Sequence, residues 1–247
     1  MFTIDCTPAD AVLWFLGQAG YLLRSGGRSV LIDPYLSDSV GQSDSRFTRR
    51  YPVPVDPKDL FADVFIVTHN HLDHLDPETI TRYGVEKDTI FVAPHLTAPH
   101  LSALGVPDER LVVLDCGQTQ VIRDVAVTGV FALGTTKSAA DTTGYKVQFA
   151  NGKSFYHTAD TSFCDLLLQA AEPADVLLAC INGKYGNMNA EQAATLAKTL
   201  DVRYAVPNHY DMMEMNRENP EVFRYACEAH GIGDRCRILE VGKAYIF

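Results

Sequence analysis

Residues 67–76, VTHNHLDHLD, place three of the chain's eight histidines and two aspartates directly after an apolar run. On a tightly turning segment, His69 and His71 project to one side, while Asp73 and His74 project to another. Imidazole and carboxylate groups suit zinc, manganese or iron, and two such pairs can serve two adjacent metal ions. The spacing H-x-H-x-D-H has a chance expectation on the order of 10⁻³ in a chain of this composition. We therefore predict a metal site.

The competing interpretation is a polar turn whose histidines only cap the next helix. Capping needs a single acceptor, and Asp76 already provides it for a helix that begins at Pro77 and stops at Gly84. The metal interpretation is therefore preferred.

The chemistry that such a site favours is hydrolysis. A bound metal ion lowers the pKa of water towards ~7, which gives hydroxide at neutral pH, and it polarises the carbonyl under attack. Asp73 is the candidate catalytic residue, because a carboxylate ligand that also contacts the nucleophile can accept its proton.

Apolar strands are expected to position this cluster. Residues 11–36 are predicted to form three short strands broken at glycines, and residues 63–68 a buried strand that leads into the cluster. Residues 37–58 are predicted to form a long polar loop beside the site. Strands and helices then alternate to the end of the chain, where two closing strands are expected. This order indicates one domain, residues 1–247, with the fold class of a four-layer α/β/β/α sandwich whose ligand groups lie on loops at one edge.

Composition limits the partners. The formal net charge of -10 argues against nucleic acid or an anionic membrane, and 47% hydrophobic residues suffice for a substantial core. Six cysteines without a C-x-x-C pair indicate small buried residues in a reducing compartment. With no targeting segment and no long apolar run, we expect a soluble, cytoplasmic protein.

At the metal cluster the chain resembles the metallo-β-lactamase superfamily. In that pattern a late aspartate and a late histidine follow at separate strand ends, where this chain has Asp160 in FYHTAD and His209 in AVPNHYD. The resemblance implies that Asp160 bridges two metal ions. It also implies that His209 completes the second metal site beside Asp73 and His74.

One histidine that is usual in the superfamily is missing. Residues 101–156 contain none, and FALGTTK stands about where it would be. The first metal would then have only His69, His71 and Asp160, with water completing its shell, so we expect weaker occupancy there.

The chain is similar, more narrowly, to the L-ascorbate-6-phosphate lactonase branch, whose members also lack that histidine. The matching motifs are LWFLGQAGYLLRSGG, GQS, THNHLDHLD, YHTAD, KYGN and VPNHYDM, with Ala159 where the branch has glycine. The resemblance implies a phosphorylated sugar lactone, L-ascorbate 6-phosphate, as the small-molecule substrate. Its ring would be opened by attack of metal-bound hydroxide on the lactone carbonyl. It further implies one or two divalent ions, with manganese expected and zinc as the alternative, and a homo-oligomer.

Six residues are candidate substrate contacts, four in the long loop and two after a later strand: Gln42, Ser43, Arg49, Arg50, Lys184 and Tyr185. Charge-assisted hydrogen bonds from them could hold a phosphate, although the two arginines could equally form an ordinary solvated pair. His157 is expected to support the site or fill the core, because it alternates away from Asp160.

Two other functions compete with the lactonase. A metal-dependent phosphodiesterase of the same fold is one, but such enzymes generally need the missing histidine. A non-catalytic binding module on a retired hydrolase scaffold is the other, and it would predict degraded ligands, whereas six of the usual seven are present.

Overall fold

The computed structural model describes residue 7 and residues 9–247. Its strands are β1 (Ala11–Gly17), β2 (Gly20–Ser25), β3 (Arg28–Ile32), β4 (Val64–Ile66), β5 (Ile90–Ala93), β6 (Leu111–Val113), β7 (Thr119–Ile122), β8 (Val125–Phe131), β9 (Thr143–Phe149), β10 (Ser154–His157), β11 (Val176–Cys180), β12 (Tyr204–Asn208) and β13 (Ala244–Ile246). Its α-helices are α1 (Ser39–Ser43), α2 (Pro77–Tyr83), α3 (Ala98–Ala103), α4 (Asp165–Ala170), α5 (Ala190–Thr199) and α6 (Pro220–Ala229).

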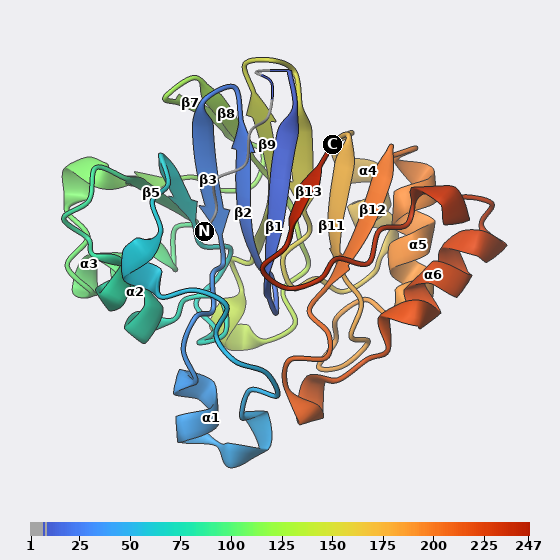
Figure 1. The fold of residues 1–247 in the computed structure, drawn as a ribbon, viewed down its shortest axis with the longest axis horizontal. Helices are drawn as coiled ribbons and strands as arrows, with labels where there is room; N and C mark the ends of the chain where they lie inside the picture. The colour runs from blue at the N-terminus through green and yellow to red at the C-terminus, as the bar shows by residue number, and fades with distance from the viewer. Residues whose placement is uncertain (1–6, 8) are drawn as a thin grey trace.

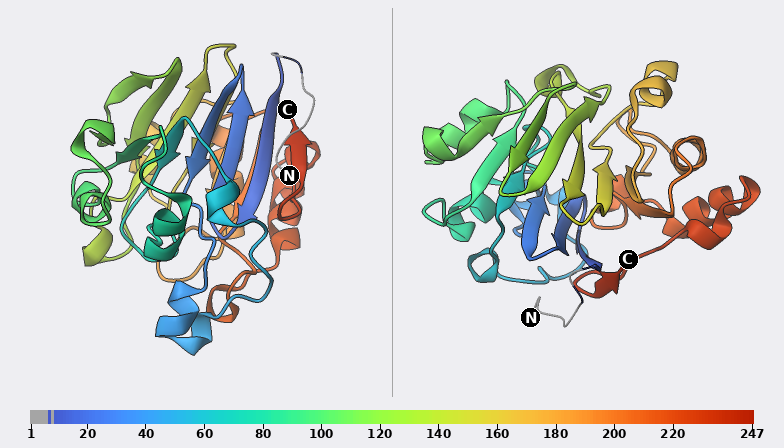
Figure 2. Two further views of the ribbon diagram at one scale, coloured as in Figure 1. Left: turned by 60° about the vertical axis from the view of Figure 1, so that its left-hand side comes forward. Right: turned by 90° about the horizontal axis from the view of Figure 1, so that it is seen from above.

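Two mixed sheets pack face to face between outer helices (Figures 1 and 2). The first has the strand order β13-β1-β2-β3-β4-β5-β6 and the second β12-β11-β10-β9-β8-β7. Helices α2 and α3 lie outside the first sheet, and α5 and α6 lie outside the second (Figure 1). The predicted four-layer α/β/β/α sandwich is confirmed.

Strand direction gathers the functional loops. Strands β3 to β6 run parallel to one another, β1 runs in the same direction, and β10 to β12 are parallel in the second sheet. The carboxyl ends of parallel strands meet at one edge of a sheet, which is where open α/β folds bind their ligands. The segments that follow β1, β3, β4, β10, β11 and β12 therefore converge.

The interior contains two large apolar clusters. The larger one fills the space between the sheets and beneath α5 and α6, with fully buried Leu13, Val147 and Phe223 among its members. The other joins the outer face of the first sheet to α2 and α3 through residues such as Trp14 and Phe65. Each sheet therefore packs against the other sheet on one face and against helices on the other. This packing fixes the positions of the strand ends that carry the site.

Capping and helix-ending residues in the sequence act in the structure as expected. Asp76 caps α2 by accepting hydrogen bonds from the backbone N–H groups of Glu78 and Thr79, and Gly84 ends the helix with a φ of 90°. The predicted opening meander is confirmed as β1 to β3.

Three elements differ from expectation. The loop 37–58 carries α1 and two short 3-10 helices, the first at Ser45–Phe47, because Asp44 caps that turn. Strands β6 and β7 were not predicted, since the exposed Val113 and Val121 interrupt the usual apolar alternation.

The prediction of two closing strands is wrong, because the described residues after α6 form only β13. The intervening chain crosses from one sheet to the other. It makes a single bridge from Cys236 to Ala205 before the N–H of Gly242 donates to the carbonyl of Phe15.

The five cysteines in the described part of the chain are free, and Cys6 lies outside it. Within the same residues no helix combines the length and the apolar character needed to cross a bilayer.

Candidate metal centre

The six predicted ligands meet at the convergent edge of the sheets and form two groups. His69, His71 and Asp160 offer ligand atoms that all lie within 4.8 Å of one another. Asp73, His74 and His209 do the same. Residues 69–74 follow β4, whereas Asp160 and His209 follow β10 and β12 of the other sheet. The centre therefore joins the two halves of the sandwich.

Hydrogen bonds orient the first two histidines. Thr68 Oγ1 donates to Asp33 Oδ2 at 2.6 Å and lies 3.0 Å from His69 Nδ1, so the hydroxyl accepts from that nitrogen. His71 places Nε2 3.0 Å from Thr136 Oγ1, and when Nε2 donates there Nδ1 carries the lone pair. His69 Nε2 and His71 Nδ1 are 3.0 Å apart, so one metal ion could contact both.

Asp33 orients His74. Burial opposes ionisation of Asp33, but His74 outweighs it and lowers the pKa of the carboxyl below its usual value. An ionised carboxylate only accepts, so His74 Nδ1, 2.7 Å from Asp33 Oδ2, donates its proton there. Burial opposes protonation of His74, but Asp160, Asp73 and Asp33 outweigh it and raise its pKa, so without a metal ion Nε2 carries a proton towards Asp160 that a metal ion would displace.

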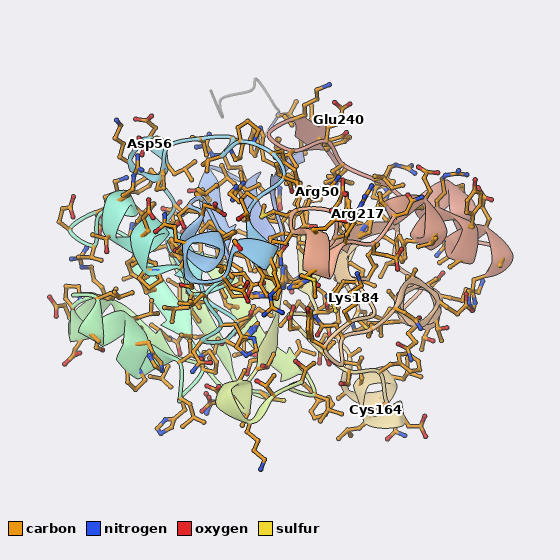
Figure 3. The ribbon with its side chains drawn as sticks, turned by 90° about the horizontal axis from the view of Figure 1, so that it is seen from below. Arg50, Asp56, Cys164, Lys184, Arg217 and Glu240 are labelled. Carbon is orange, nitrogen blue, oxygen red and sulfur yellow. The ribbon has the colours of Figure 1, made fainter. Side chains whose placement is uncertain are left out.

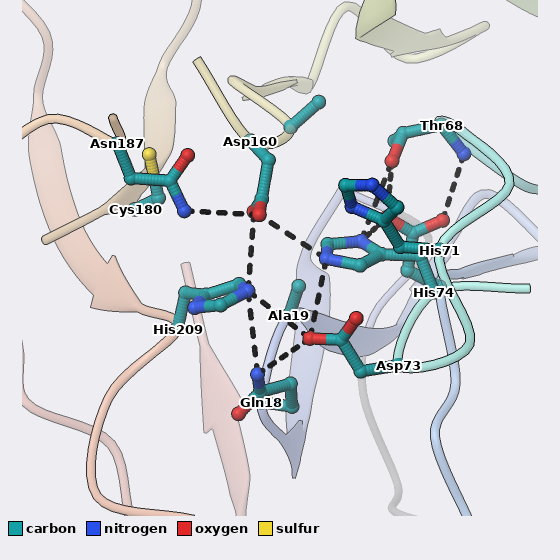
Figure 4. A network of polar contacts seen from close by, with 12 residues as sticks. Gln18, Ala19, Thr68, His71, Asp73, His74, Asp160, Cys180, Asn187 and His209 are labelled. Atoms are coloured by element: carbon teal, nitrogen blue, oxygen red, sulfur yellow. Dashed lines mark hydrogen bonds and ion pairs between the residues drawn. The ribbon is translucent and has the colours of Figure 1, made fainter. Parts of the chain in front are cut away.

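Asp160 lies between the two groups (Figure 4). Its Oδ1 is 3.3 Å from His74 Nε2 and 3.2 Å from His209 Nε2, and Asn187 Nδ2 donates to its Oδ2 at 2.9 Å. Neither Asp160 Oδ1 nor His74 Nε2, both buried, has a hydrogen bond within the described residues. One carboxylate is thus positioned to contact both groups.

The second group is held by a residue that follows β1 and by one in the segment after β12. Gln18 Nε2 donates to Asp73 Oδ2 at 2.8 Å, and the amide of Asn216 lies 2.9 Å from His209 Nδ1. Burial opposes protonation of His209, but Asp160 and Asp73 outweigh it and raise its pKa to about 9. Without a metal ion, a proton takes the position between these groups.

The donor set fits a divalent metal ion. His69 Nε2 and His71 Nδ1 lie 3.0 Å apart, and burial lowers the pKa of His69 to about 3, so its ring is neutral near neutral pH, the form in which imidazole binds metal. The buried carboxylate of Asp160 and the partly buried one of Asp73 supply the negative charge that a cation needs. Nitrogen and carboxylate donors of this kind suit zinc and manganese.

Backbone strain is concentrated at this edge. Gln18, Asp33, Ala159 and His209 each follow a strand and each has a left-handed φ, between 42° and 58°. Such conformations cost non-glycine residues about 1–3 kcal/mol and persist where the surrounding structure imposes them. Here each one turns a polar side chain, its own or that of the next residue, towards the centre.

His157 is not a ligand. Its Nε2 donates to the carbonyl of Ala19 at 2.9 Å, and its Nδ1 accepts from the N–H of Ala159 at 3.0 Å. The prediction of a supporting or core residue is confirmed, since these bonds hold the turn that precedes Asp160.

The segment expected to lack the usual histidine does reach the centre. Thr136 contacts His71, and both Thr135 and Thr136 line the adjoining cavity. Hydroxyl groups thus stand near the first group of ligands, where the superfamily pattern has an imidazole.

A cavity of about 260 Å³ opens beside the metal centre. It is lined by four ligands, four other polar residues and four apolar or aromatic residues: His71, Asp73, Asp160, His209, Thr135, Thr136, Asn187, Asn216, Val40, Phe47, Tyr185 and Met213. Of the six candidate substrate contacts, Tyr185 alone is in this lining.

The other candidate contacts have protein partners or face solvent. The Arg49 guanidinium donates to the carbonyls of Tyr35 and Ser37, at 2.8 and 3.1 Å. Arg50 forms ion pairs with Asp211 and Glu214. Figure 3 shows Arg50, Lys184 and Arg217 near one another on the face seen from below.

Lys184 donates to the carbonyl of Arg217 at 2.7 Å. Gln42 is exposed, as is Ser43, whose hydroxyl donates to the carbonyl of Ser39. The structure does not bring these residues to the cavity.

Sequence reasoning missed the residues that hold the ligands: Gln18, Asp33, Thr68, Asn187 and Asn216. A signal was present for two of them, because Gln18 and Asp33 directly follow apolar strands, as the histidine cluster does. The asparagines stand in loops whose paths only the fold defines.

Known proteins are similar to this chain in sequence and in fold. The model of the beta-lactamase superfamily domain matches residues 28–210. A UPF0173 metal-dependent hydrolase of Archaeoglobus fulgidus is 32% identical over 248 residues, with 96% of this chain and 98% of the relative covered. The chain belongs to this family of the beta-lactamase superfamily. A UPF0173 hydrolase of Methanosarcina mazei is 29% identical over 232 residues, covering 90% and 92%.

The solved structure of Igni18, a metallo hydrolase of Ignicoccus hospitalis, shares the fold of this UPF0173 member. It superposes with a TM-score of 0.78 at 23% identity and covers 96% of this chain and 98% of that one. The predicted metallo-β-lactamase superfamily is confirmed.

In this UPF0173 hydrolase, Asp33→Asn should weaken metal binding about 10- to 100-fold, because the ring of His74 loses the ionised acceptor that fixes its tautomer. Competition with a chromophoric chelator measures the metal affinity. Asp63→Asn is the matched control, since Asp63 is a buried aspartate of the same sheet that accepts from Ser29. An unchanged affinity in Asp33→Asn would show that the carboxylate does not serve the centre.

Proposed function

We propose that this hydrolase uses divalent metal ions at the centre to open a lactone. The observation that supports it best is the pair of ligand groups joined at Asp160 beside a cavity that exposes Asp73 and His209. When bound, the metal supplies hydroxide near neutral pH and polarises the carbonyl.

The protein's own groups complete the reaction. His69, His71 and Asp160 would hold one ion, and Asp73, His74 and His209, with Asp160 shared, the other. Gln18, His74 and His209 all contact Oδ2 of Asp73, which leaves Oδ1 to take up the proton of the attacking water. The ring C–O bond would then break, and the same proton would pass from Asp73 to the leaving ring oxygen.

The resemblance to the lactonase branch makes L-ascorbate 6-phosphate the first substrate to test. The cavity supports an uncharged lactone as the alternative, because the cations expected to bind the phosphate lie outside its lining. The missing histidine argues against a phosphodiesterase.

A substrate panel tests the proposal. Manganese- and zinc-loaded protein should hydrolyse lactones with kcat/KM at least about 100-fold above that for phosphodiesters. A preference for phosphodiesters would refute the lactonase, and no hydrolysis of either class would favour the binding module.

The same panel tests the phosphate contacts. A charged anchor contributes about 1.5–3 kcal/mol, so its loss would raise KM for a phosphorylated lactone about ten-fold or more. Because Arg50 and Lys184 already bind protein partners, we expect Arg50→Met and Lys184→Met to affect phosphorylated and unphosphorylated lactones equally. A selective loss on the phosphorylated one would identify the anchor.

A further inference from the structure

A third apolar cluster, separate from the two main cores, lies beside the metal centre. It consists of buried Tyr35, Met212 and Met213, with Val40, Phe47 and Tyr51 packed against it. Val40, Phe47 and Met213 also line the cavity, together with Tyr185, whose ring lies 6.3 Å from that of Phe47. We call these four cavity-lining residues the apolar wall.

The wall is held in place by the groups expected to bind phosphate. The N–H of Arg50 donates to the carbonyl of Met212 at 2.8 Å, and Arg49 forms a β-bridge with Met213. The guanidinium of Arg49 lies over the rings of Tyr35 and Tyr51. These contacts join the loop after β3 to the loop after β12, so the wall is preformed.

The charge around the cavity is negative. Asp73 and Asp160 are its charged lining residues apart from the histidines, and the part of the chain that the structure describes contributes no lysine or arginine to the lining. A bound metal ion would balance these carboxylates at the reacting centre. At the wall, a charged substituent would find no counter-charge and would lose its hydration.

The wall leaves part of the Tyr185 ring free for a ligand to cover, and Tyr185 lines the cavity. Tyr185 is 54% exposed, although a phenol ring normally contributes most when its apolar face is covered. A cavity of about 260 Å³ is also smaller than the roughly 300–1,000 Å³ of typical ligand sites. Both observations favour a small ligand that covers the wall.

We propose that the apolar wall binds an apolar substituent of a small, uncharged substrate while the scissile carbonyl faces the metal centre. This rests on the proposed hydrolysis and names the substrate class: neutral lactones or esters that carry an alkyl or aryl group. The wall selects for the substituent, and the metal ligands act on the carbonyl.

Hydroxamates test the proposal without turnover, since they bind metal through the same head group whatever their tail. Isothermal titration calorimetry on the metal-loaded protein would compare acetohydroxamate, hexanohydroxamate and the monohydroxamate of succinic acid. Hexanohydroxamate should bind at least about 30-fold more tightly than acetohydroxamate, because each buried methylene contributes about four-fold. The carboxylate-tailed compound should bind no better than acetohydroxamate.

Matched variants locate the effect. Phe47→Asn and Tyr185→Ser should each reduce the hexano-to-aceto ratio several-fold with metal content unchanged. Tyr225→Ser, which removes an equally exposed tyrosine from α6, should keep the ratio.

Equal affinity for the short and long tails, no measurable binding, or preference for the charged tail would overturn the proposal. So would an unchanged ratio in both wall variants. Absence of lactone hydrolysis together with the expected tail dependence would count against the proposed reaction alone.

Discussion

Replacing Asp160 by asparagine should lower kcat/KM by about three orders of magnitude or more while the fold persists. Asp160 is the carboxylate that lies within 3.3 Å of His74 and His209 and shares a ligand group with His69 and His71. The substitution keeps its size but removes the charge that holds two cations together. Steady-state kinetics and metal analysis of the same sample measure both consequences, and bound metal should fall with activity.

The interpretation depends on showing that the variant is folded. Circular dichroism and a cooperative thermal transition provide that check, and Asp201→Asn, at an exposed aspartate paired with Arg235, is the neutral control. Near-normal turnover in folded Asp160→Asn would show that this carboxylate is not a ligand.

The sandwich could be predicted from the sequence because its buried strands are written as continuous apolar runs. Strands such as β4 and β11 are apolar throughout, since helices cover one face of their sheet and the other sheet covers the second. Prediction failed where burial is partial. The edge strand β7 exposes Val121, and the crossing segment before β13 pairs with each sheet only once, so neither shows a regular alternation.

The ligands were predictable because local spacing already requires them to meet. His69, His71, Asp73 and His74 stand within one turn, and no folding information is needed to place them together. Asp160 and His209 come from the other sheet. Spacing could not place them, and the superfamily pattern did.

The substrate contacts were not predictable in this way. Arginine and lysine side chains reach many partners, and the sequence does not show which one each residue finds. In the structure Arg50 forms ion pairs with Asp211 and Glu214, and its N–H donates to the carbonyl of Met212 beside the apolar wall. A residue that was a candidate for phosphate binding therefore supports the wall instead. The chemistry of a residue type limits its roles, but the neighbours supplied by the fold select among them.

Removing the metal should abolish activity and lower the melting temperature. A ligand present at 100 times its Kd stabilises the native state by about 2.7 kcal/mol, which corresponds to roughly 5–10 °C for a domain of this size. The loss on chelation should be reversed by manganese or zinc. Differential scanning calorimetry of chelated and reloaded protein measures it, and an unchanged melting temperature and activity would argue against a metal enzyme.

Reloading should also be ordered, with the second group filling before the first. With the shared Asp160, the second site has four protein ligands: Asp73, His74, His209 and Asp160. The first site has only three: His69, His71 and Asp160. Crystals soaked with one equivalent of metal should therefore show anomalous signal beside His209, and a second peak beside His71 only at excess. A well-occupied ion bound by His69 and His71, with none touching His209, would refute this assignment, because the shared carboxylate would then not favour the site with more protein ligands.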